Sequence, residues 1–137
     1  MTAAHPIERW HALIAARDPS QLAALLAEDV VFYSPVLHTP QRGKQLTTMY
    51  LTGAFHVLLN EHFRYVHELT GDGSAMLEFE SKLDEIYING VDLIRFDASG
   101  QITEFKVMVR PLKGIQTLQA KMRELLERLP PGAKSSP

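Results

Sequence analysis

The chain of 137 residues contains no cysteine, which excludes disulfide bonds, thiol catalysis and metal sites built from thiolates. It also has no excess of charge of either sign, because 14 Lys and Arg residues oppose 16 Asp and Glu residues. Without a basic block to neutralise phosphates, no nucleic acid partner is expected. No apolar run approaches the length of a membrane span, and the first residues, MTAAHPIERW, do not form a secretory signal. We therefore expect a cytoplasmic protein without a membrane partner.

What the chain does contain is the composition of an ordinary folded domain. Hydrophobic residues make up 45% and charged residues 22% of the sequence, as is typical of globular proteins. A chain of this length buries roughly two-thirds of its unfolded surface, which is enough for one hydrophobic core. No internal repeat or linker divides it. We predict a single domain over residues 1–130 and a flexible tail over residues 131–137.

Helical spacing dominates the first half of the sequence. Pro6, followed by apolar residues at positions 7, 10, 13 and 14, predicts an amphipathic helix that runs to about residue 17. Asp18 and Pro19 are typical of a helix start, so a second, short helix should follow. A β-branched and aromatic run over 30–33 predicts a strand followed by a loop. A third helix, apolar on much of its circumference, is predicted over 44–59.

The second half alternates between apolar and polar residues, as β-strands do. Turns that contain glycine separate the alternating stretches and predict an antiparallel meander of strands over 63–69, 75–88, 91–96 and 102–109. Helical spacing returns from Leu112 onward and predicts a long amphipathic helix, which packs across the sheet or on a partner helix. This order of elements predicts an α+β fold that combines an antiparallel sheet with a C-terminal amphipathic helix.

The dipeptide Asn89-Gly90 favours a two-residue turn of type I′, which would pair Ile88 with Val91. Counting outward then places Tyr87 opposite Asp92. In this register one face of the sheet carries Leu83, Glu85, Tyr87, Asp92, Ile94 and Phe96, and the other carries Ile86, Ile88, Val91 and Leu93. Both faces would be partly apolar, which predicts that a second copy of the chain covers the outer face in a homodimer.

Several short segments, at their spacings in this sequence, resemble a known family. They are 91–97 (VDLIRFD), 99–102 (SGQI), Asp29-Val30, Ser34-Pro35 with Pro40 and Gly43, and Met49-Tyr50. Together with the order of elements, they resemble the nuclear transport factor 2-like superfamily, especially its ketosteroid-isomerase and SnoaL-like polyketide-cyclase branches. The resemblance implies a curved antiparallel sheet wrapped into a cone around helices and an apolar pocket inside it. It also implies a dimer formed through the outer face of the sheet.

The same resemblance assigns roles to individual residues. Asp92 matches a protonated carboxylic acid that donates a hydrogen bond to a developing oxyanion, and Tyr50 matches a tyrosine that supports this oxyanion hole. Trp10 stands where the isomerases have another tyrosine, and its indole can donate one hydrogen bond but accept none. Ser34 stands at the position of the general base, and an unactivated hydroxyl cannot remove a proton from carbon near pH 7. Ketosteroid isomerisation itself is therefore not expected.

The remaining candidates each have a functional and a structural interpretation. His38 could replace the missing base or lie on the surface of its loop. Glu85, diagonal to Asp92 in the predicted register, could share a proton with it or be solvated. Tyr87 could donate to Asp92 or only cap the end of the sheet, and Asp92 itself could be a solvated turn residue. An apolar ligand is expected because the predicted pocket also includes Trp10, Ser34, Met49, Phe79, Ile94, Phe105, Val107 and Val109.

The histidines form neither an HExxH motif nor a pair at i, i+4, so no metal or other cofactor is expected. Two hypotheses of function remain open. The first is an isomerase, cyclase or hydrolase that performs acid–base chemistry around Asp92 on an apolar small molecule. The second is a non-catalytic ligand-binding or protein-interaction module, in which Ser34 reflects the absence of a reaction. A second titratable group near Asp92, such as His38 or Glu85, would distinguish the enzyme from the binding module.

Overall fold

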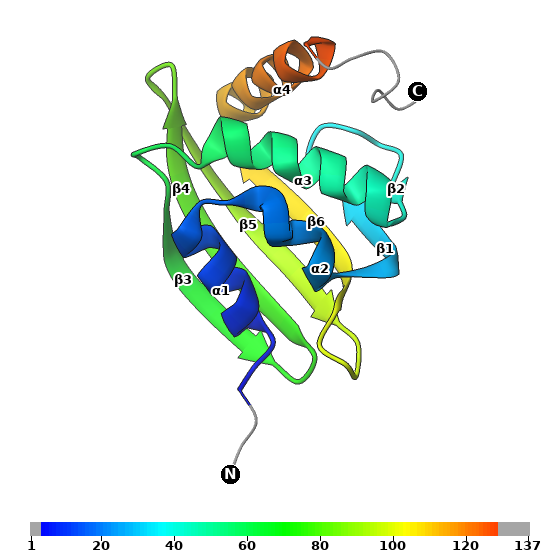
Figure 1. The fold of residues 1–137 in the computed structure, drawn as a ribbon. Coiled ribbons are helices and arrows are strands. Elements are labelled where there is room, and N and C mark those ends of the chain that lie inside the picture. The colour runs from blue at the N-terminus through cyan, green and yellow to red at the C-terminus, as the bar shows by residue number, and fades with distance from the viewer. Residues whose placement is uncertain (1–3, 129–137) are drawn as a thin grey trace.

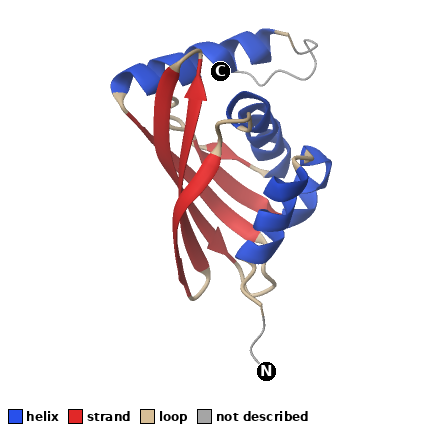
Figure 2. Ribbon diagram, turned by 90° about the vertical axis from the view of Figure 1, so that its left-hand side faces the viewer, coloured by secondary structure: helices blue, strands red, loops and turns tan. Residues whose placement is uncertain are grey.

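A curved, six-stranded β-sheet and the helices on its concave side make up residues 4–128, which the computed structural model describes (Figure 1). Seen from the side, the strands bend around the helices, and the C-terminal helix lies across one end of the sheet (Figure 2). The helical elements are α1 (Ile7–Ala16), the 3-10 helix η1 (Pro19–Gln21), α2 (Leu22–Leu25), α3 (Lys44–Leu58) and α4 (Leu112–Glu127). The strands are β1 (Leu26–Tyr33), β2 (Gln41–Arg42), β3 (Arg64–Gly71), β4 (Ser74–Leu83), β5 (Ile86–Phe96) and β6 (Ile102–Arg110).

The strand order in the sheet is β2-β1-β6-β5-β4-β3. Strands β3 to β6 form the predicted antiparallel meander, and β1 joins it in parallel to β6. The curved sheet, the helices on its concave side and the C-terminal helix confirm the predicted α+β fold class. Among the described residues, no helix is long and apolar enough to cross a membrane.

The first helices form where the sequence predicts them. Trp10 is buried on the apolar face of α1, and Arg17 ends this helix in the left-handed conformation, with a φ of 53°. The side chain of Asp18 then accepts a 3.0 Å hydrogen bond from the backbone N–H of Ser20 and so caps η1. These two caps turn the chain between α1 and α2, and α2 leads directly into β1.

The turn between β4 and β5 differs from the prediction. Asp84 and Glu85 form it, both with positive φ angles (48° and 66°), and Leu83 pairs with Ile86. The predicted turn at Asn89-Gly90 lies within β5 instead. Positive φ at both central residues is the conformation that favours Asn-Gly in type I′ turns. The chain therefore makes such a turn with a less typical pair of residues, five positions earlier than predicted.

Gly90 is needed for close packing within the sheet rather than for a turn. A Cβ atom at this position would lie 2.6 Å from the ring of Phe79 and 2.6 Å from the backbone oxygen of Met108. Both distances are far below van der Waals contact, so only glycine fits without displacing its neighbours. A glycine inside a strand commonly marks such a close approach.

The misplaced turn changes which residues face the core. Ile88 is fully buried on the inner face, although the predicted register assigned it to the outer face. Tyr87 points outward and is 44% exposed, so it does not lie opposite Asp92. Asp92 and Ile94 are buried on the inner face, and Val91 lies on the outer face, as predicted, because the positions after the supposed turn keep their alternation.

Helix α4 packs on its own chain. A Cβ atom at Gly53 of α3 would lie 3.1 Å from Met122 of α4, which shows how closely the two helices approach. Leu118 of α4 is buried with residues of β4 and β5 in one of two groups of core side chains. The predicted end of the domain at residue 130 and the predicted tail over 131–137 lie outside the described residues.

Candidate functional site

A cavity of about 810 Å³ lies between the concave face of the sheet and helices α1, α3 and α4. This volume is within the range of small-molecule sites, and most of the cavity wall is apolar. The predicted site residues that line it are Trp10, Ser34, His38, Met49, Tyr50, Phe79, Asp92, Phe105 and Val107. Most of the predicted site residues therefore lie in this wall, and six different parts of the chain bring them together.

Two predicted site residues lie far from this cavity because the β4–β5 turn was misplaced. Glu85 belongs to the turn itself, its side chain is 88% exposed, and it forms an ion pair with Lys82. Tyr87 lies on the outer face, where its hydroxyl donates a 2.6 Å hydrogen bond to Glu80. The predictions that Glu85 shares a proton with Asp92 and that Tyr87 contacts this carboxyl group are therefore wrong.

Two further predicted residues, Ile94 and Val109, belong to the core but not to the cavity wall. Helix α4 contributes further residues to the cavity wall, among them Leu118, Met122 and Arg123. The sequence predicted α4 as an amphipathic helix that packs on a partner helix or across the open side of the sheet, but it did not decide between the two. That placement depends on how the helix docks after β6, and helical spacing alone does not specify it.

Asp92 is the end of a chain of hydrogen bonds within the cavity. The Tyr65 hydroxyl donates to Oδ2 of Asp92 at 3.1 Å, and Nε1 of Trp10 donates to the Tyr65 oxygen at 2.9 Å. Three separate elements supply these side chains, because Trp10 lies on α1, Tyr65 on β3 and Asp92 on β5. All three residues line the cavity. The structural interpretation of Asp92 as a solvated turn residue is therefore wrong, since it lies within β5 and is 7% exposed.

Burial controls the protonation of Asp92. Loss of solvent raises the pKa of its carboxyl group from 3.8 to about 7, although the hydrogen bond from Tyr65 stabilises the carboxylate and lowers it. Burial, and secondarily the charge of Asp92, raise the pKa of the Tyr65 hydroxyl well above its usual value. Tyr65 is thus a neutral donor at every physiological pH, whereas Asp92 is present in both protonation states near neutral pH.

Tyr65 is a site residue that the sequence did not predict. This residue pairs with Phe79 on β4, but the register shifts between Tyr65 and His67, where β3 contains a bulge. A bulge inserts one residue and changes which positions of a strand face inward. No turn residue or glycine marks the bulge in the sequence, so simple alternation could not show that Tyr65 reaches Asp92.

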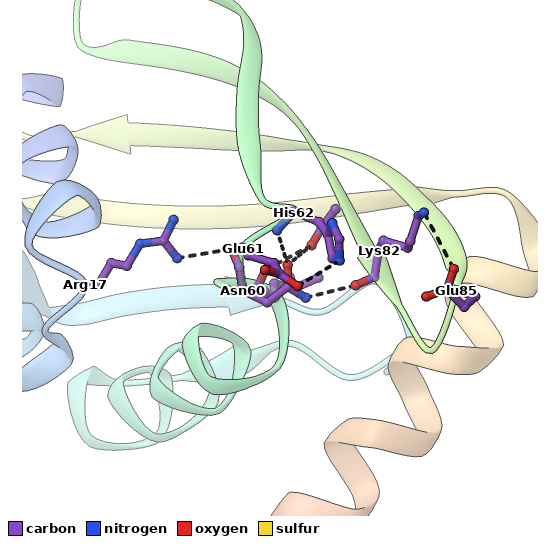
Figure 3. A network of polar contacts seen from close by, with 8 residues as sticks. Arg17, Asn60, Glu61, His62, Lys82 and Glu85 are labelled. Atoms are coloured by element: carbon purple, nitrogen blue, oxygen red, sulfur yellow. Dashed lines mark hydrogen bonds and ion pairs between the residues drawn. The ribbon is translucent and has the colours of Figure 1, made fainter.

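The turn that leads from α3 into β3 is held by a network of polar contacts around Asn60 (Figure 3). The Asn60 amide donates to the backbone oxygen of Lys82 at 2.9 Å, and its Oδ1 accepts from the N–H of His62 at 2.8 Å. Arg17, at the end of α1, donates to the backbone oxygen of Asn60 at 3.2 Å. These contacts join α1, the α3–β3 turn and β4, and they fix the point from which Tyr65 enters the cavity.

The other predicted catalytic residues enter the cavity from the connection after β1 and from α3. The Ser34 hydroxyl accepts hydrogen bonds from two backbone N–H groups that follow it, at 3.1 and 3.3 Å, and so stabilises a turn. The ring of Tyr50 stacks on Phe32 with 6.1 Å between centroids. His38 lines the cavity from an exposed loop position. Within residues 4–128, no three His, Asp or Glu side chains gather as a metal site would require.

A family model described as a SnoaL-like domain matches residues 7–105. The chain belongs to the SnoaL-like family. This family lies within the nuclear transport factor 2-like superfamily, as the sequence resemblance implied. No curated protein matches this SnoaL-like chain.

Solved structures share the SnoaL-like fold at two levels of similarity. A steroid delta-isomerase from Pseudomonas aeruginosa is 42% identical, with 89% of each chain covered and a TM-score of 0.85. An uncharacterised protein with a cystatin-like fold from Silicibacter pomeroyi is 32% identical, with 90% of this chain and 86% of the other covered and a TM-score of 0.82. An epoxide hydrolase/cyclase-like enzyme of pyran ring formation in salinomycin has a TM-score of 0.62 at 15% identity over 77% and 88% of the chains, which shows the fold alone.

Proposed function

We propose that this SnoaL-like domain binds an apolar small molecule that presents an oxygen atom to Asp92. The observation that carries the proposal is the position of this carboxyl group, which is buried in a largely apolar cavity and has a pKa raised to about 7. A neutral carboxyl group can donate a hydrogen bond to a carbonyl, ether or epoxide oxygen, whereas a carboxylate cannot. The cavity therefore supports an apolar ligand with one such acceptor.

The same group can act as an acid in a reaction. When negative charge develops on a ligand oxygen, as in an enolate or an opening epoxide, the O–H of Asp92 stabilises it by donating a hydrogen bond or its proton. Isomerases, cyclases and epoxide hydrolases all need such a step. The name of one similar structure, a steroid delta-isomerase that is 42% identical, agrees with this class of chemistry.

An enzyme of this class also needs a base. Ser34 is a poor candidate, because its oxygen accepts hydrogen bonds from two backbone N–H groups and no titratable partner of the hydroxyl occurs among the described residues. His38 is the predicted candidate that lines the cavity, and an imidazole can act as a general base. The arrangement at Ser34 favours the second candidate function, a binding module without catalysis, unless His38 supplies the base.

The first test is native mass spectrometry of the purified protein, followed by denaturation to release and weigh any bound molecule. We expect a copurified apolar molecule that contains an oxygen acceptor. A Δ5-3-ketosteroid should then be tested with the wild type and with the Asp92→Asn and His38→Gln variants. Turnover that both variants lose supports the enzyme, and binding without turnover supports the module. The proposal would be refuted if no molecule copurifies with the protein and the ketosteroid does not bind.

We also propose that the protein forms a homodimer through the convex face of the sheet. Met76 pairs with Leu93, and Val91 pairs with Met108, so these side chains form an apolar strip on that face, with Met108 49% exposed. Exposed apolar strips commonly mark protein interfaces. Light scattering at micromolar concentration should give twice the mass of one chain, and Met108→Glu should give a monomer. A wild-type protein with the mass of one chain would contradict the proposed homodimer.

The cytoplasmic location of the protein stays a prediction.

A further inference from the structure

The hydrogen-bond chain that ends at Asp92 has a fixed direction. The indole N–H of Trp10 can only donate, so the oxygen of Tyr65 must be the acceptor of their 2.9 Å contact. Tyr65 has one proton, and the described residues offer its hydroxyl no acceptor other than Oδ2 of Asp92, at 3.1 Å. The chain therefore runs from Trp10 through Tyr65 to Asp92, and the indole N–H favours this direction because it occupies a lone pair of the Tyr65 oxygen and makes the hydroxyl a stronger donor.

This direction determines which oxygen of Asp92 carries the acidic proton. Oδ2 accepts from Tyr65, so a neutral Asp92 must hold its own proton on Oδ1. Tyr65 is the hydrogen-bond partner of this carboxyl group among the described residues, and Asp92 lines the cavity. The proton on Oδ1 is therefore available to form a hydrogen bond with a ligand. If residue 10 lacked the N–H, the Tyr65 oxygen would be a better acceptor for the proton of Asp92, and the ligand would lose part of its donor.

We infer that Trp10 is a positioning residue that acts through Tyr65. It holds the acidic proton of Asp92 on Oδ1, the oxygen that is available to the ligand. The site thereby selects ligands with a hydrogen-bond acceptor. The inference rests on the proposed function for the presence of a ligand. The direction of the chain itself does not depend on that function, because it follows from the hydrogen-bond partners of Tyr65. The resemblance to isomerases assigns no such role, since it places a tyrosine at this position.

Other titratable groups near the chain must be separated from Asp92 in any pH titration. The neighbours of Asp92 on the adjacent strands, Leu77 and Val107, are apolar. His11 of α1 stacks edge-on against the Tyr65 ring at 5.9 Å and pairs with Glu68 of β3. The titratable or charged residues that line the cavity from the other elements are His38, Tyr50, Arg123 and Glu127. Asp92→Asn and His11→Gln variants identify which group a measured midpoint belongs to.

The decisive experiment measures the pKa of Asp92 without any ligand. Carboxyl carbons of 13C-labelled aspartate are followed by NMR across pH, with the Asp92 signal assigned from the Asp92→Asn variant. A Tyr65 hydroxyl that accepts from Trp10 is the stronger donor to the carboxylate, so Trp10→Phe should raise the midpoint of Asp92 by on the order of half a pH unit. The control is Phe55→Leu, which removes a ring that packs edge-on against Trp10 at 5.9 Å but leaves the N–H.

We expect the midpoint to rise in Trp10→Phe and to stay in place in Phe55→Leu. An unchanged midpoint in Trp10→Phe, or the same rise in both variants, would overturn the inference. Because Trp10 is the one tryptophan of the chain, its indole can also be replaced by the benzothiophene analogue, which keeps the ring and lacks the N–H. This replacement should raise the midpoint as well, and it decides the question if Trp10→Phe does not fold.

A second measurement tests the selection of ligands. The ketone 2-acetylnaphthalene should bind the wild type at pH 5.5, by calorimetry, and its affinity should fall as pH rises through the midpoint of Asp92. In the Trp10→Phe variant we expect at least a threefold weaker affinity at pH 5.5, whereas equal affinity would overturn the positioning role. If the wild type binds neither this ketone nor the ketosteroid and no molecule copurifies with it, the proposed function fails, and the NMR titration still decides the direction of the hydrogen-bond chain.

Discussion

Each face of the sheet carries a tyrosine hydroxyl that donates a hydrogen bond to a carboxyl group, and the two carboxyl groups differ in their burial. On the concave face the Tyr65 hydroxyl donates to Asp92, and on the convex face the Tyr87 hydroxyl donates to Glu80. Burial raises the pKa of Asp92 to about 7, whereas the hydrogen bonds from Tyr87 and Arg64 lower the pKa of the partly exposed Glu80. A tyrosine donor favours the carboxylate in both places, so burial decides which carboxyl group keeps its proton.

The surroundings of the two carboxyl groups explain why they serve different purposes. Glu80 lies on the convex face beside Arg64, and Arg95 pairs with Glu104 on the same face. These exposed pairs keep the carboxylates charged and hydrated. Asp92 has no ion pair among the described residues and faces a cavity large enough for a small molecule. The concave face is therefore the place where this fold can hold a neutral acid.

The largest effect expected from the contrast between Asp92 and Glu80 is a pH dependence of the free energy of unfolding. A carboxyl group whose pKa is raised by folding binds its proton more tightly in the folded state, so the free energy of unfolding falls as pH rises from about 4 to 7. The rise from 3.8 to about 7 corresponds to at most about 4 kcal/mol. Asp92→Asn should abolish this fall. The variant should unfold like the wild type at pH 4 but be more stable than it at pH 8.

Urea denaturation of both proteins at several pH values between 4 and 8 measures this difference. Parallel pH dependences for the wild type and Asp92→Asn would show that the carboxyl group is solvated in the folded protein. The contrast between the two faces would then be lost.

A somewhat smaller effect is expected from a glycine on each face. A Cβ atom at Gly90 would lie 2.6 Å from Phe79 and from a backbone oxygen, so Gly90→Ala should destabilise the protein by about 2–3 kcal/mol. At Gly71, the nearest atom to an added Cβ is the flexible Ser74 side chain at 3.1 Å. Gly71→Ala should therefore leave the thermal midpoint nearly unchanged. Equal losses in the two variants would mean that Phe79 can move away from Gly90.

The sequence predicted the elements of this fold better than its strand register. Helical spacing placed α1 and α3 to within about two residues at each end, and the strands of the meander were found with their order. The error concerned Asn89-Gly90, where the strongest turn signal in the sequence belongs to a strand. Local propensity at Gly90 was overridden by packing against Phe79, which no local pattern reveals.

The candidate site was predicted where it depends on alternation or on resemblance, and missed where it depends on geometry. Asp92 lies in the cavity as the resemblance implied, while Glu85 and Tyr87 were displaced with the misplaced turn. Tyr65 reaches Asp92 through a bulge in β3. A bulge arises from how two strands fit together, so the identity of the residues in one strand does not predict it.

The two tyrosines provide the next comparison. Tyr65→Phe removes the hydrogen bond to the buried carboxylate, so the pKa of Asp92 should rise above 7 and stability at pH 8 should fall by about 1–2 kcal/mol. At pH 5 the loss should be smaller, because Asp92 is then neutral. Tyr87→Phe removes an exposed hydroxyl and should show no such difference between the two pH values. A loss of equal size at pH 5 and pH 8 would show that the Tyr65 hydroxyl does not stabilise the carboxylate of Asp92 in particular.

The smallest effect is expected at Glu80, and its sign is opposite to that at Asp92. Folding lowers the pKa of Glu80, first through the hydrogen bond from Tyr87 and then through that from Arg64, so this carboxylate stabilises the folded protein above pH 4.5. The contribution is lost as pH falls through the folded pKa. Glu80→Gln should therefore lower the thermal midpoint slightly at pH 7 and not at pH 3, and added salt should reduce the difference because the pair is exposed. A salt-independent loss comparable to that of Tyr65→Phe would show that the convex face is shielded from solvent, as it would be in the proposed homodimer.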